Sequence, residues 1–248
     1  MIRPLEAGDA PQLFDMMARV YANHSFLDQG QAQYVAQISN GNYVSLGLFD
    51  GNTLKAHAGY NVTDEYALLN TLVVDPTHRS TGLGADIFNA RLKHIVNSDM
   101  FRFVVGYSMM QHIKSQRLYD DDFMPIGMDI GYPDIYQQDQ GFNCGSAANA
   151  ELILCKRLAL GGEQPIIPLA ERDRPLAHTI LGALGITPTF TCGTATGASF
   201  LGFHPTKTGE LYLPAYLDPD VLADFSGAQA SNQRRQDFVT TIEANYHG

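Results

Sequence analysis

The chain has 248 residues, with 26 Asp and Glu against 16 Lys and Arg, which gives a net charge of −10. Hydrophobic residues make up 45% and charged residues 17%, a composition that excludes disorder for most of the chain and allows one large domain or two small ones. Because the acidic balance disfavours nonspecific attraction to phosphate backbones, we expect no nucleic-acid partner.

The sequence shows no pattern typical of a membrane or export signal. No run of about 18 apolar residues is present, so we expect no membrane-spanning segment. Met1–Glu6 lacks the basic-then-apolar pattern of a signal peptide. The three cysteines, Cys144, Cys155 and Cys192, have no CxxC spacing, which argues against a disulfide scaffold or a cysteine zinc site. We therefore expect a cytoplasmic protein without a bound metal.

Residues 1–125 are predicted to alternate between strands and helices. The turn Asp50-Gly51-Asn52, between two β-rich runs, indicates a β-hairpin. The next run, Tyr66–Val74, is apolar at nearly every position, as in a strand covered on both faces, and ends at Asp75-Pro76 because proline lacks a backbone donor. The other elements expected here are a strand at Ile2–Leu5, a helix capped by Asp9, a helix at 31–38, hairpin strands at 43–49 and 55–62, a helix from Leu83, a strand at 101–107 and a short helix at 115–121.

The pattern is weaker beyond Asp129. We expect a strand at 151–158, a helix at 172–184, a hairpin of 199–203 with 210–215, and a helix at 232–246. In this last helix, Arg234 and Arg235 are expected on the surface. The order strand, helix, hairpin, helix loosely echoes the front half, which leaves a degenerate half-duplication open.

The segment most informative about function follows the predicted strand 66–74. It reads His78-Arg79-Ser80-Thr81-Gly82-Leu83-Gly84-Ala85-Asp86 and places two glycines where an amphipathic helix begins. A helix N-terminus exposes unpaired N–H groups and the positive end of the helix dipole. Glycines let the backbone approach an anion closely, and the Arg79 guanidinium can donate to phosphate oxygens. Residues 79–85 therefore predict a pyrophosphate cradle, with an ordinary glycine-rich helix start as the alternative.

Two common phosphate motifs do not fit this loop. A Walker A loop needs Lys and Ser or Thr where Ala85-Asp86 stands, and a dinucleotide fingerprint needs a third glycine at Ile87. The spacing Arg79-x-x-Gly82-x-Gly84 instead resembles the acetyl-CoA loop of the Gcn5-related N-acetyltransferase (GNAT) superfamily. The resemblance implies a GNAT acyl-CoA N-acyltransferase fold over residues 1–158, of α/β (α+β) class with a mixed central sheet flanked by helices. Residues 159–248 would be a small α/β C-terminal extension.

The resemblance also implies how acetyl-CoA, as cosubstrate, is held. The backbone of Leu72–Val74 pairs with the pantetheine arm as if it were another strand, and the glycine loop holds the diphosphate. The residues expected to bind the cofactor are Leu72, Val73, Val74, Arg79, Ser80, Thr81, Gly82, Leu83, Gly84, Ala85 and Ser115.

A second segment, from His112 to Tyr119, resembles the family's Asn-x-x-Ser-x-x-x-Tyr stretch. The resemblance implies that Tyr119 lies near the thioester sulfur and protonates the departing thiolate. His112 replaces the usual Asn, as in some GNAT proteins linked to a histidine-kinase-like ATPase domain. The usual Tyr-x-x-x-Gly-Phe ending is one residue shorter here and lacks the glycine.

The general base is less clear from the residues. An alkylamine with a pKa of about 10.4 is mostly protonated at pH 7, so a base or a site that lowers this pKa is valuable. Leu68-Leu69-Asn70 stands where the family often has a mid-strand Glu, so Glu65 and His112 are the candidates. Water relayed to a backbone carbonyl is another route. His24 and His57 line an acceptor pocket or, as the commoner case, are structural.

These assignments predict an N-acetyltransferase that transfers acetyl from acetyl-CoA to a primary amine by direct attack. The acceptor, a small-molecule or peptidyl amine, is not identified by the sequence. The alternative is a non-catalytic acyl-CoA-binding regulatory or sensor protein, because the mid-strand carboxylate is missing and the C-terminal region is extra. A nucleotide-binding protein of another class is disfavoured by the failed phosphate motifs. Whether the extension restricts the acceptor site or forms a homodimer stays open.

Overall fold

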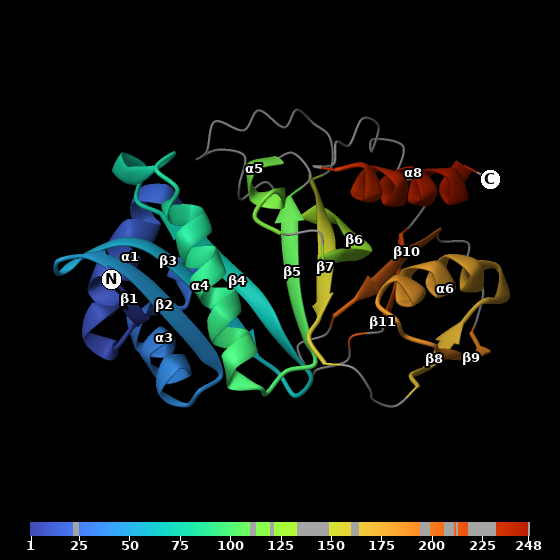
Figure 1. Cartoon of the computed structure of the whole chain (residues 1–248), viewed down its shortest axis with the longest axis horizontal. Coiled ribbons are helices and arrows are strands. Elements are labelled where there is room, and N and C mark those ends of the chain that lie inside the picture. The colour runs from blue at the N-terminus through green and yellow to red at the C-terminus, as the bar shows by residue number, and fades with distance from the viewer. Residues whose placement is uncertain are drawn as a thin grey trace. The chain divides into compact units, whose positions relative to one another are not determined.

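The computed structural model describes residues 1–21, 25–109, 113–119, 122–132, 149–159, 164–193, 199–205, 211, 213–217 and 232–247 (Figure 1). These residues fall into two compact units, a first unit of residues 1–101 and a second unit of residues 102–247.

The first unit is built on four antiparallel strands in the order β1-β2-β3-β4. The predicted hairpin is confirmed: β2 and β3 meet at a turn where Gly51 has a φ of +56°, a left-handed conformation that glycine adopts easily. The predicted strand 66–74 is confirmed as β4. The bounds are β1 (Ile2–Pro4), β2 (Tyr43–Asp50), β3 (Thr53–Val62) and β4 (Tyr66–Val74).

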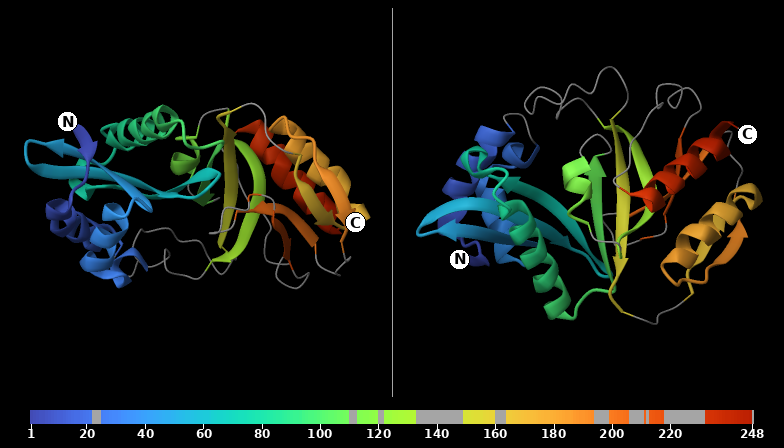
Figure 2. Two further views of the ribbon diagram at one scale, coloured as in Figure 1. Left: turned by 90° about the horizontal axis from the view of Figure 1, so that it is seen from below. Right: turned by 45° about the horizontal axis from the view of Figure 1, so that its top comes forward.

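Helices cover both faces of these strands; in the left view of Figure 2, α4 lies above them and α1 and α3 lie below. Because strand side chains alternate, Tyr43 packs on the face of α1 and α3, whereas Leu46 and Ala58 pack on the face of α4. The bounds are α1 (Ala10–Val20), α2 (Ser25–Asp28), α3 (Gly30–Ser39) and α4 (Leu83–Ser98), with short 3-10 turns at Ala7–Asp9 and Pro76–His78.

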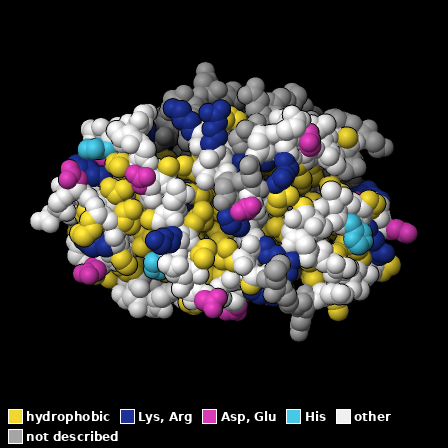
Figure 3. All heavy atoms as spheres, in the orientation of Figure 1, with side chains coloured by type: hydrophobic (Ala, Val, Ile, Leu, Met, Phe, Trp, Pro, Cys, Tyr) yellow, Lys and Arg dark blue, Asp and Glu magenta, His cyan; other side chains and the backbone are white. Residues whose placement is uncertain are grey.

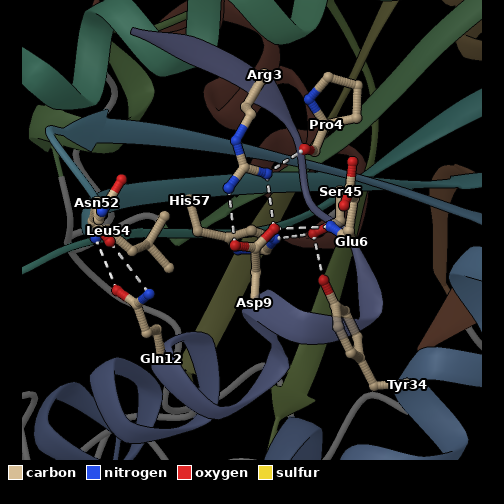
Figure 4. Close-up of polar contacts among 10 residues, drawn as sticks. All are labelled: Arg3, Pro4, Glu6, Asp9, Gln12, Tyr34, Ser45, Asn52, Leu54 and His57. Carbon is tan, nitrogen blue, oxygen red and sulfur yellow. Dashed lines mark hydrogen bonds and ion pairs between the residues drawn. The ribbon is translucent and has the colours of Figure 1, made fainter.

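An ion pair ties β1 to the start of α1 (Figure 4). Asp9 is the N-cap residue of α1, as predicted, but its carboxylate does not cap that helix. It accepts two hydrogen bonds from the Arg3 guanidinium, at 2.7 and 2.8 Å, and one from the backbone N–H of Glu6 at 2.8 Å. The hydrogen bonds from Arg3 hold the pKa of the Asp9 carboxyl below its usual value.

A buried polar network joins α3 to the sheet (Figure 4). The Tyr34 hydroxyl donates to Ser45 Oγ at 2.8 Å, and Ser45 Oγ lies 2.7 Å from His57 Nε2. None of the three side chains is more than 3% exposed. Burial lowers the pKa of His57 to about 3, so the ring is neutral at pH 7. His57 is therefore a structural residue of the core.

A β-bulge interrupts β4 at Thr71. Gly59 of β3 pairs with Asn70, but the preceding Ala58 pairs with Leu72, so Thr71 is an extra residue in β4. Its φ of +25° is unusual for a residue with a side chain.

The bulge sets which way the end of β4 faces. Beyond Thr71, Leu72 and Val74 pack on the α4 face and Val73 packs on the face of α1 and α3. Because strand side chains alternate with a period of two, removing the extra residue would exchange these faces.

Arg91 of α4 holds the bulge in place. Its side chain is only 2% exposed, and its guanidinium donates to the carbonyl oxygens of Gly59, at 2.9 Å, and Asn70, at 2.8 Å. These two carbonyls belong to the last paired residues before the register shift. The Asn70 side chain adds to this, because its Oδ1 accepts from the Thr71 N–H at 2.8 Å.

The second unit is built on five strands in the order β5-β7-β6-β10-β11, all antiparallel to their neighbours. The pair β6–β10 meets at Gly127 and Gly202. A Cβ at Gly127 would lie 2.4 Å from the Phe203 carbonyl oxygen, and one at Gly202 would lie 2.3 Å from that of Ile126. Only glycine permits this approach. The bounds are β5 (Phe103–Met109), β6 (Met124–Tyr132), β7 (Asn149–Arg157), β10 (Ser199–His204) and β11 (Leu213–Leu217).

Among its described residues, the rest of the second unit contains a parallel pair of short strands and three helices. The bounds are α5 (Ile113–Gln116), β8 (Ile166–Leu169), α6 (Arg174–Ala183), β9 (Thr189–Cys192) and α8 (Gln233–His247), with a 3-10 turn at Glu171–Asp173.

The segment 166–183 repeats the local structure of the N-terminus. Pro168-Leu169 and Asp173-Arg174-Pro175 have the spacing of Pro4-Leu5 and Asp9-Ala10-Pro11. In both places a strand leads through a 3-10 turn to a helix, and the aspartate is a nearly buried N-cap residue. The pairing differs, because β1 is antiparallel to β2 and β8 is parallel to β9. The half-duplication therefore stays a prediction with local support.

Most predicted elements are confirmed, including the helix from Leu83 and the hairpin β10–β11. The sequence missed β6, β8 and β9, and the helix expected at 115–121 extends only over 113–116. The predicted domain boundary at 158/159 differs from the boundary between the compact units at 101/102. Where a GNAT-like domain would end stays a prediction.

We predict that His57 makes the protein less stable in acid. The unfolded chain binds a proton at the ordinary pKa of about 6.5, whereas folded His57 does so only near pH 3, so stability is full above pH 6.5 and falls below it. From pH 6.5 to 4.5 the loss due to His57 should be about 2.3 kcal/mol. Urea unfolding of the wild type and of His57→Asn at several pH values should show a shallower pH dependence in the variant.

Tyr34→Phe is the control for this experiment. It removes a hydrogen bond from the same network, but burial raises the pKa of Tyr34 to about 12, so no proton is exchanged in this pH range. Its unfolding free energy should be lower than that of the wild type by a constant amount. Equal slopes for the wild type and His57→Asn would contradict the prediction.

A second prediction concerns the bulge. Arg91→Met removes the donors to two carbonyl oxygens, and we expect the unfolding free energy to fall by about 2–4 kcal/mol. Lys93→Met, at an exposed position of the same helix, should change it by no more than about 0.5 kcal/mol. Equal urea midpoints for the two variants would show that Arg91 does not hold the bulge.

Candidate functional site

The loop between β4 and α4 combines left-handed residues with a helix N-terminus. Ser80 has a φ of +64° and Gly82 a φ of +91°. The first turn of α4 is closed by the N–H groups of Ala85 and Asp86, which donate to the Gly82 carbonyl at 2.9 and 3.1 Å. The two amides before Ala85 therefore precede the first helical hydrogen bond and lie at the positive end of the dipole. Such a loop suits an anion.

The predicted loop residues are accessible to a ligand. The structure leaves Arg79, Ser80, Thr81 and Gly82 exposed, and Leu83 and Gly84 half-buried. Ala85 is exposed, but its N–H is used inside the helix.

The two glycines of the loop have different roles. A Cβ at Gly82 would meet no atom within 4 Å, so this glycine is needed for its positive φ and leaves open space above the turn. A Cβ at Gly84 would only touch Val74 Cγ2 at 3.6 Å, which is an ordinary contact.

Asp75 holds the start of the loop. Its carboxylate accepts hydrogen bonds from the Thr77 hydroxyl and from the Thr77 N–H, the latter at 3.0 Å, and pairs with Arg19 of α1 at 2.9 Å. These contacts, with the Thr77 hydroxyl first, hold the pKa of the Asp75 carboxyl well below its usual range. Thr81 Oγ1 donates to the His78 carbonyl at 2.6 Å. Contacts within the first unit therefore preform the loop.

The first unit brings the two predicted cofactor segments into one continuous path. Leu72–Val74 lies directly between the bulge at Thr71 and the loop that begins at Asp75. Leu72 and Val74 are half-buried, and Val73 is buried. A strand end followed by an anion-binding turn can hold an extended chain that carries a phosphate group at one end.

The second unit contains Ser115 and Tyr119. Ser115 lies on α5, with its Oγ 3.4 Å from Ser108 Oγ of β5. Tyr119 follows α5 and is 9% exposed. Its hydroxyl donates to the Tyr107 carbonyl at 3.2 Å, and its ring packs edge-on against Phe123 with centroids 5.0 Å apart. Whether these residues and the loop form one site stays a prediction, since they belong to different units.

Two residues that the sequence analysis did not single out fix Tyr119. A Cβ at Gly106 would lie 2.5 Å from the Tyr119 hydroxyl oxygen, so the glycine leaves room for the phenol. Arg235 of α8 is 1% exposed and donates to the carbonyl oxygens of Gln116, at 2.7 Å, and Tyr119, at 3.2 Å. The expectation that Arg235 lies on the helix surface is wrong.

Glu151 of β7 is a further titratable group that the sequence did not indicate. Burial, followed by the charge of Asp129 on the neighbouring strand, raises the pKa of Glu151 to about 7. Gly106 pairs with Leu154, three residues from Glu151, so Glu151 points to the face opposite the one that Tyr119 covers.

The predicted base Glu65 lies just before β4. It stands six residues before Thr71, a separation of about 20 Å along a strand. The structure therefore does not bring it to the end of β4. His112, the other candidate base, and His24 lie outside the described residues.

Side chains of Lys and Arg on the face in Figure 3 are interspersed with hydrophobic and uncharged ones, and Asp and Glu occur among them. Among the described residues, no three His, Cys, Asp or Glu side chains gather as metal ligands would. None of the helices in these parts of the chain has the length and apolar character to cross a membrane.

No family profile and no curated protein matches the sequence. Solved structures do match. The ribosomal-protein-S18-alanine N-acetyltransferase from Escherichia coli is 18% identical over 66% of this chain and 96% of its own, with a TM-score of 0.53. A spermidine N-acetyltransferase chimera from Vibrio cholerae and hSSAT is 15% identical over 64% of this chain and 96% of its own, with a TM-score of 0.52.

An acetyltransferase of the GNAT family from Streptococcus pneumoniae is also similar, at 15% identity over 64% of this chain and 99% of its own, with a TM-score of 0.52. At these identities the likeness concerns the fold. The predicted α/β architecture of strands flanked by helices is confirmed, and the chain has the fold of the GNAT N-acetyltransferases.

Proposed function

We propose that the chain is an acetyl-CoA-dependent N-acetyltransferase acting on a primary amine of a small molecule or peptide. The observation that supports this most is the preformed loop at Ser80–Gly84, which continues directly from the bulged end of β4. The fold adds support, since the similar solved proteins include acetyltransferases named for a protein alanine and for spermidine.

In this proposal the diphosphate of coenzyme A lies on the turn. The amides at the start of α4 donate to phosphate oxygens, and Arg79 adds a charged donor pair. The pantetheine arm follows the backbone of Leu72–Val74, the segment beyond the bulge that pairs with Ala56–Ala58 of β3 along one edge. This path delivers the thioester to the region of the bulge.

The chemistry is direct acyl transfer. The neutral amine attacks the thioester carbonyl, the C–S bond breaks, the thiolate takes a proton, and the amine loses one. A thiolate with a pKa of about 8.5 leaves with little help, whereas freeing an amine of pKa about 10.4 at pH 7 costs about 4.6 kcal/mol. Base assistance therefore matters more than acid assistance.

Tyr119 is the proposed acid. Its hydroxyl is held by the Tyr107 carbonyl, which fixes the direction of the phenol. The proposed base is His112 or a water relayed to a carbonyl, because Glu65 lies about 20 Å along β4 from the bulge.

A non-catalytic acyl-CoA sensor is the second candidate function. The middle of β4 carries Leu68, Leu69 and Asn70, and the Asn70 amide oxygen is already engaged by Thr71. Binding without turnover for every amine in a broad library would favour this sensor function.

We predict that Gly82→Val and Arg79→Ala weaken acetyl-CoA binding by about 10- to 100-fold, the effect of losing one or two charge-assisted hydrogen bonds. Valine is strained at the φ of +91°, and alanine lacks the guanidinium. Calorimetric dissociation constants would measure the loss. Gly8→Ala is the control, because its Cβ also meets no atom within 4 Å but its φ is not positive.

Ligand specificity distinguishes an acetyl-CoA-binding protein from proteins that bind other phosphate-containing ligands. Acetyl-CoA at 100 times its dissociation constant should stabilise the wild type by about 2.7 kcal/mol, while ATP and NAD should give less. If both loop variants kept the full affinity for acetyl-CoA, the proposal that this loop binds the diphosphate would be wrong.

We also predict that Tyr119→Phe lowers kcat by up to about 10²- to 10³-fold, because it removes the acid without removing the acceptor-side base. The KM for acetyl-CoA should change little. Thiol release with an amine library measures both constants. A variant with unchanged kcat would exclude Tyr119 as the acid.

A further inference from the structure

We propose that the C-terminal helix α8 supports the catalytic centre and that Arg235 is a positioning residue for Tyr119. The inference deepens the proposed function, on which its kinetic test rests. It gives one helix of the C-terminal extension a role, which the sequence left open.

Arg235 contacts the chain where Tyr119 is attached. Its guanidinium donates to the carbonyls of Gln116 and Tyr119, residues that precede it by 119 and 116 positions. The side chain is 1% exposed, so these bonds are shielded from water.

The segment that carries Tyr119 needs such a support. Helix α5 has four residues, and the Gln116 carbonyl at its end accepts a hydrogen bond from the Tyr119 N–H at 3.2 Å, which leaves its second lone pair for the Arg235 guanidinium. A guanidinium suits this task because its planar fork presents several donors in fixed directions. Arg235 therefore fixes the backbone, while Gly106 and Phe123 fix the phenol ring.

Helix α8 is itself anchored. The Asn232 side chain accepts from the Arg235 N–H at 3.0 Å, which caps the helix start. Phe238, Val239 and Ile242 are buried and follow Arg235 at intervals of three, four and seven residues, so all lie on one stripe. Moving Arg235 away from Tyr119 would require moving this packed helix.

The kinetic test compares Arg235→Met and Arg235→Lys with Arg234→Met. Arg234 is the matched control, because it is the exposed arginine next in sequence on the same helix. We expect Arg235→Met to lower kcat by about 10-fold with the KM for acetyl-CoA within about twofold, because the misplaced group acts only in the chemical step. Arg235→Lys, which keeps one donor, should fall between it and the wild type, and Arg234→Met should match the wild type.

A double variant separates positioning from general stability. In a Tyr119→Phe background, Arg235→Met should cause no further loss of kcat, because the group that it positions is gone. A further 10-fold loss in that background, or equal losses in Arg235→Met and Arg234→Met, would overturn the inference.

A readout without turnover keeps this test independent of the proposed function. In the NMR spectrum of the protein labelled with ¹³C-tyrosine, the Tyr119 resonance is identified as the one that disappears in the Tyr119→Phe variant. It should shift in Arg235→Met and stay in place in Arg234→Met; an unmoved resonance would refute the positioning role. A shifted resonance in a protein that acetylates no amine would support positioning and refute the transferase. If Arg235→Met does not fold, Arg235→Lys gives both readouts.

Discussion

The hydrogen bonds from Arg91 to the carbonyls of Gly59 and Asn70 are the contacts on which the candidate site depends most. They stabilise a register shift in the middle of an otherwise regular antiparallel pair. The shift turns Leu72 and Val74 toward α4, and α4 begins at the turn that we propose binds the diphosphate. One buried side chain thus couples the helix that carries the turn to the strand that leads into it.

Arg235 makes the same kind of contact in the second unit, where it is buried and donates to two backbone carbonyls. Each arginine stands on the apolar stripe of its helix, Arg91 between Ile87 and Ile95, and Arg235 before Phe238. Each donates to two backbone carbonyls at an irregular point of the hydrogen bonding, Arg91 at a register shift between two strands and Arg235 at the end of a short helix. Burying a charged guanidinium costs free energy unless hydrogen-bond acceptors surround it. The position of each arginine side chain is therefore fixed by the carbonyls that accept from it.

The sequence predicted the parts of the fold with strong local signals. The Asp50-Gly51 turn, the apolar run 66–74 and the glycines before α4 all combine pattern and turn chemistry. Strand β6 was missed because Pro125 and Gly127 are typical of turns, and tertiary pairing with β7 and β10 overrides that preference. β8 and β9 have four residues each, too few for a periodicity to stand out.

The parts of the candidate site that depend on a local backbone pattern could be predicted from the sequence. The parts that depend on contacts between distant residues could not. The loop 79–85 follows from spacing alone. Arg91 and Arg235 are charged residues that a surface helix also carries, and only their place on the apolar stripe distinguishes them. The pKa of Glu151 depends on Asp129, 22 positions earlier in the chain, and on burial, neither of which the sequence shows directly.

The glycine contact between β6 and β10 also protects a sheet edge. Without β10, β6 would be an open sheet edge, which is a template for pairing with other molecules. The C-terminal third closes that edge, and its glycines allow little substitution at the crossing. A chain that lacked β10 would need another way to shield β6, such as a charged or proline-bearing edge.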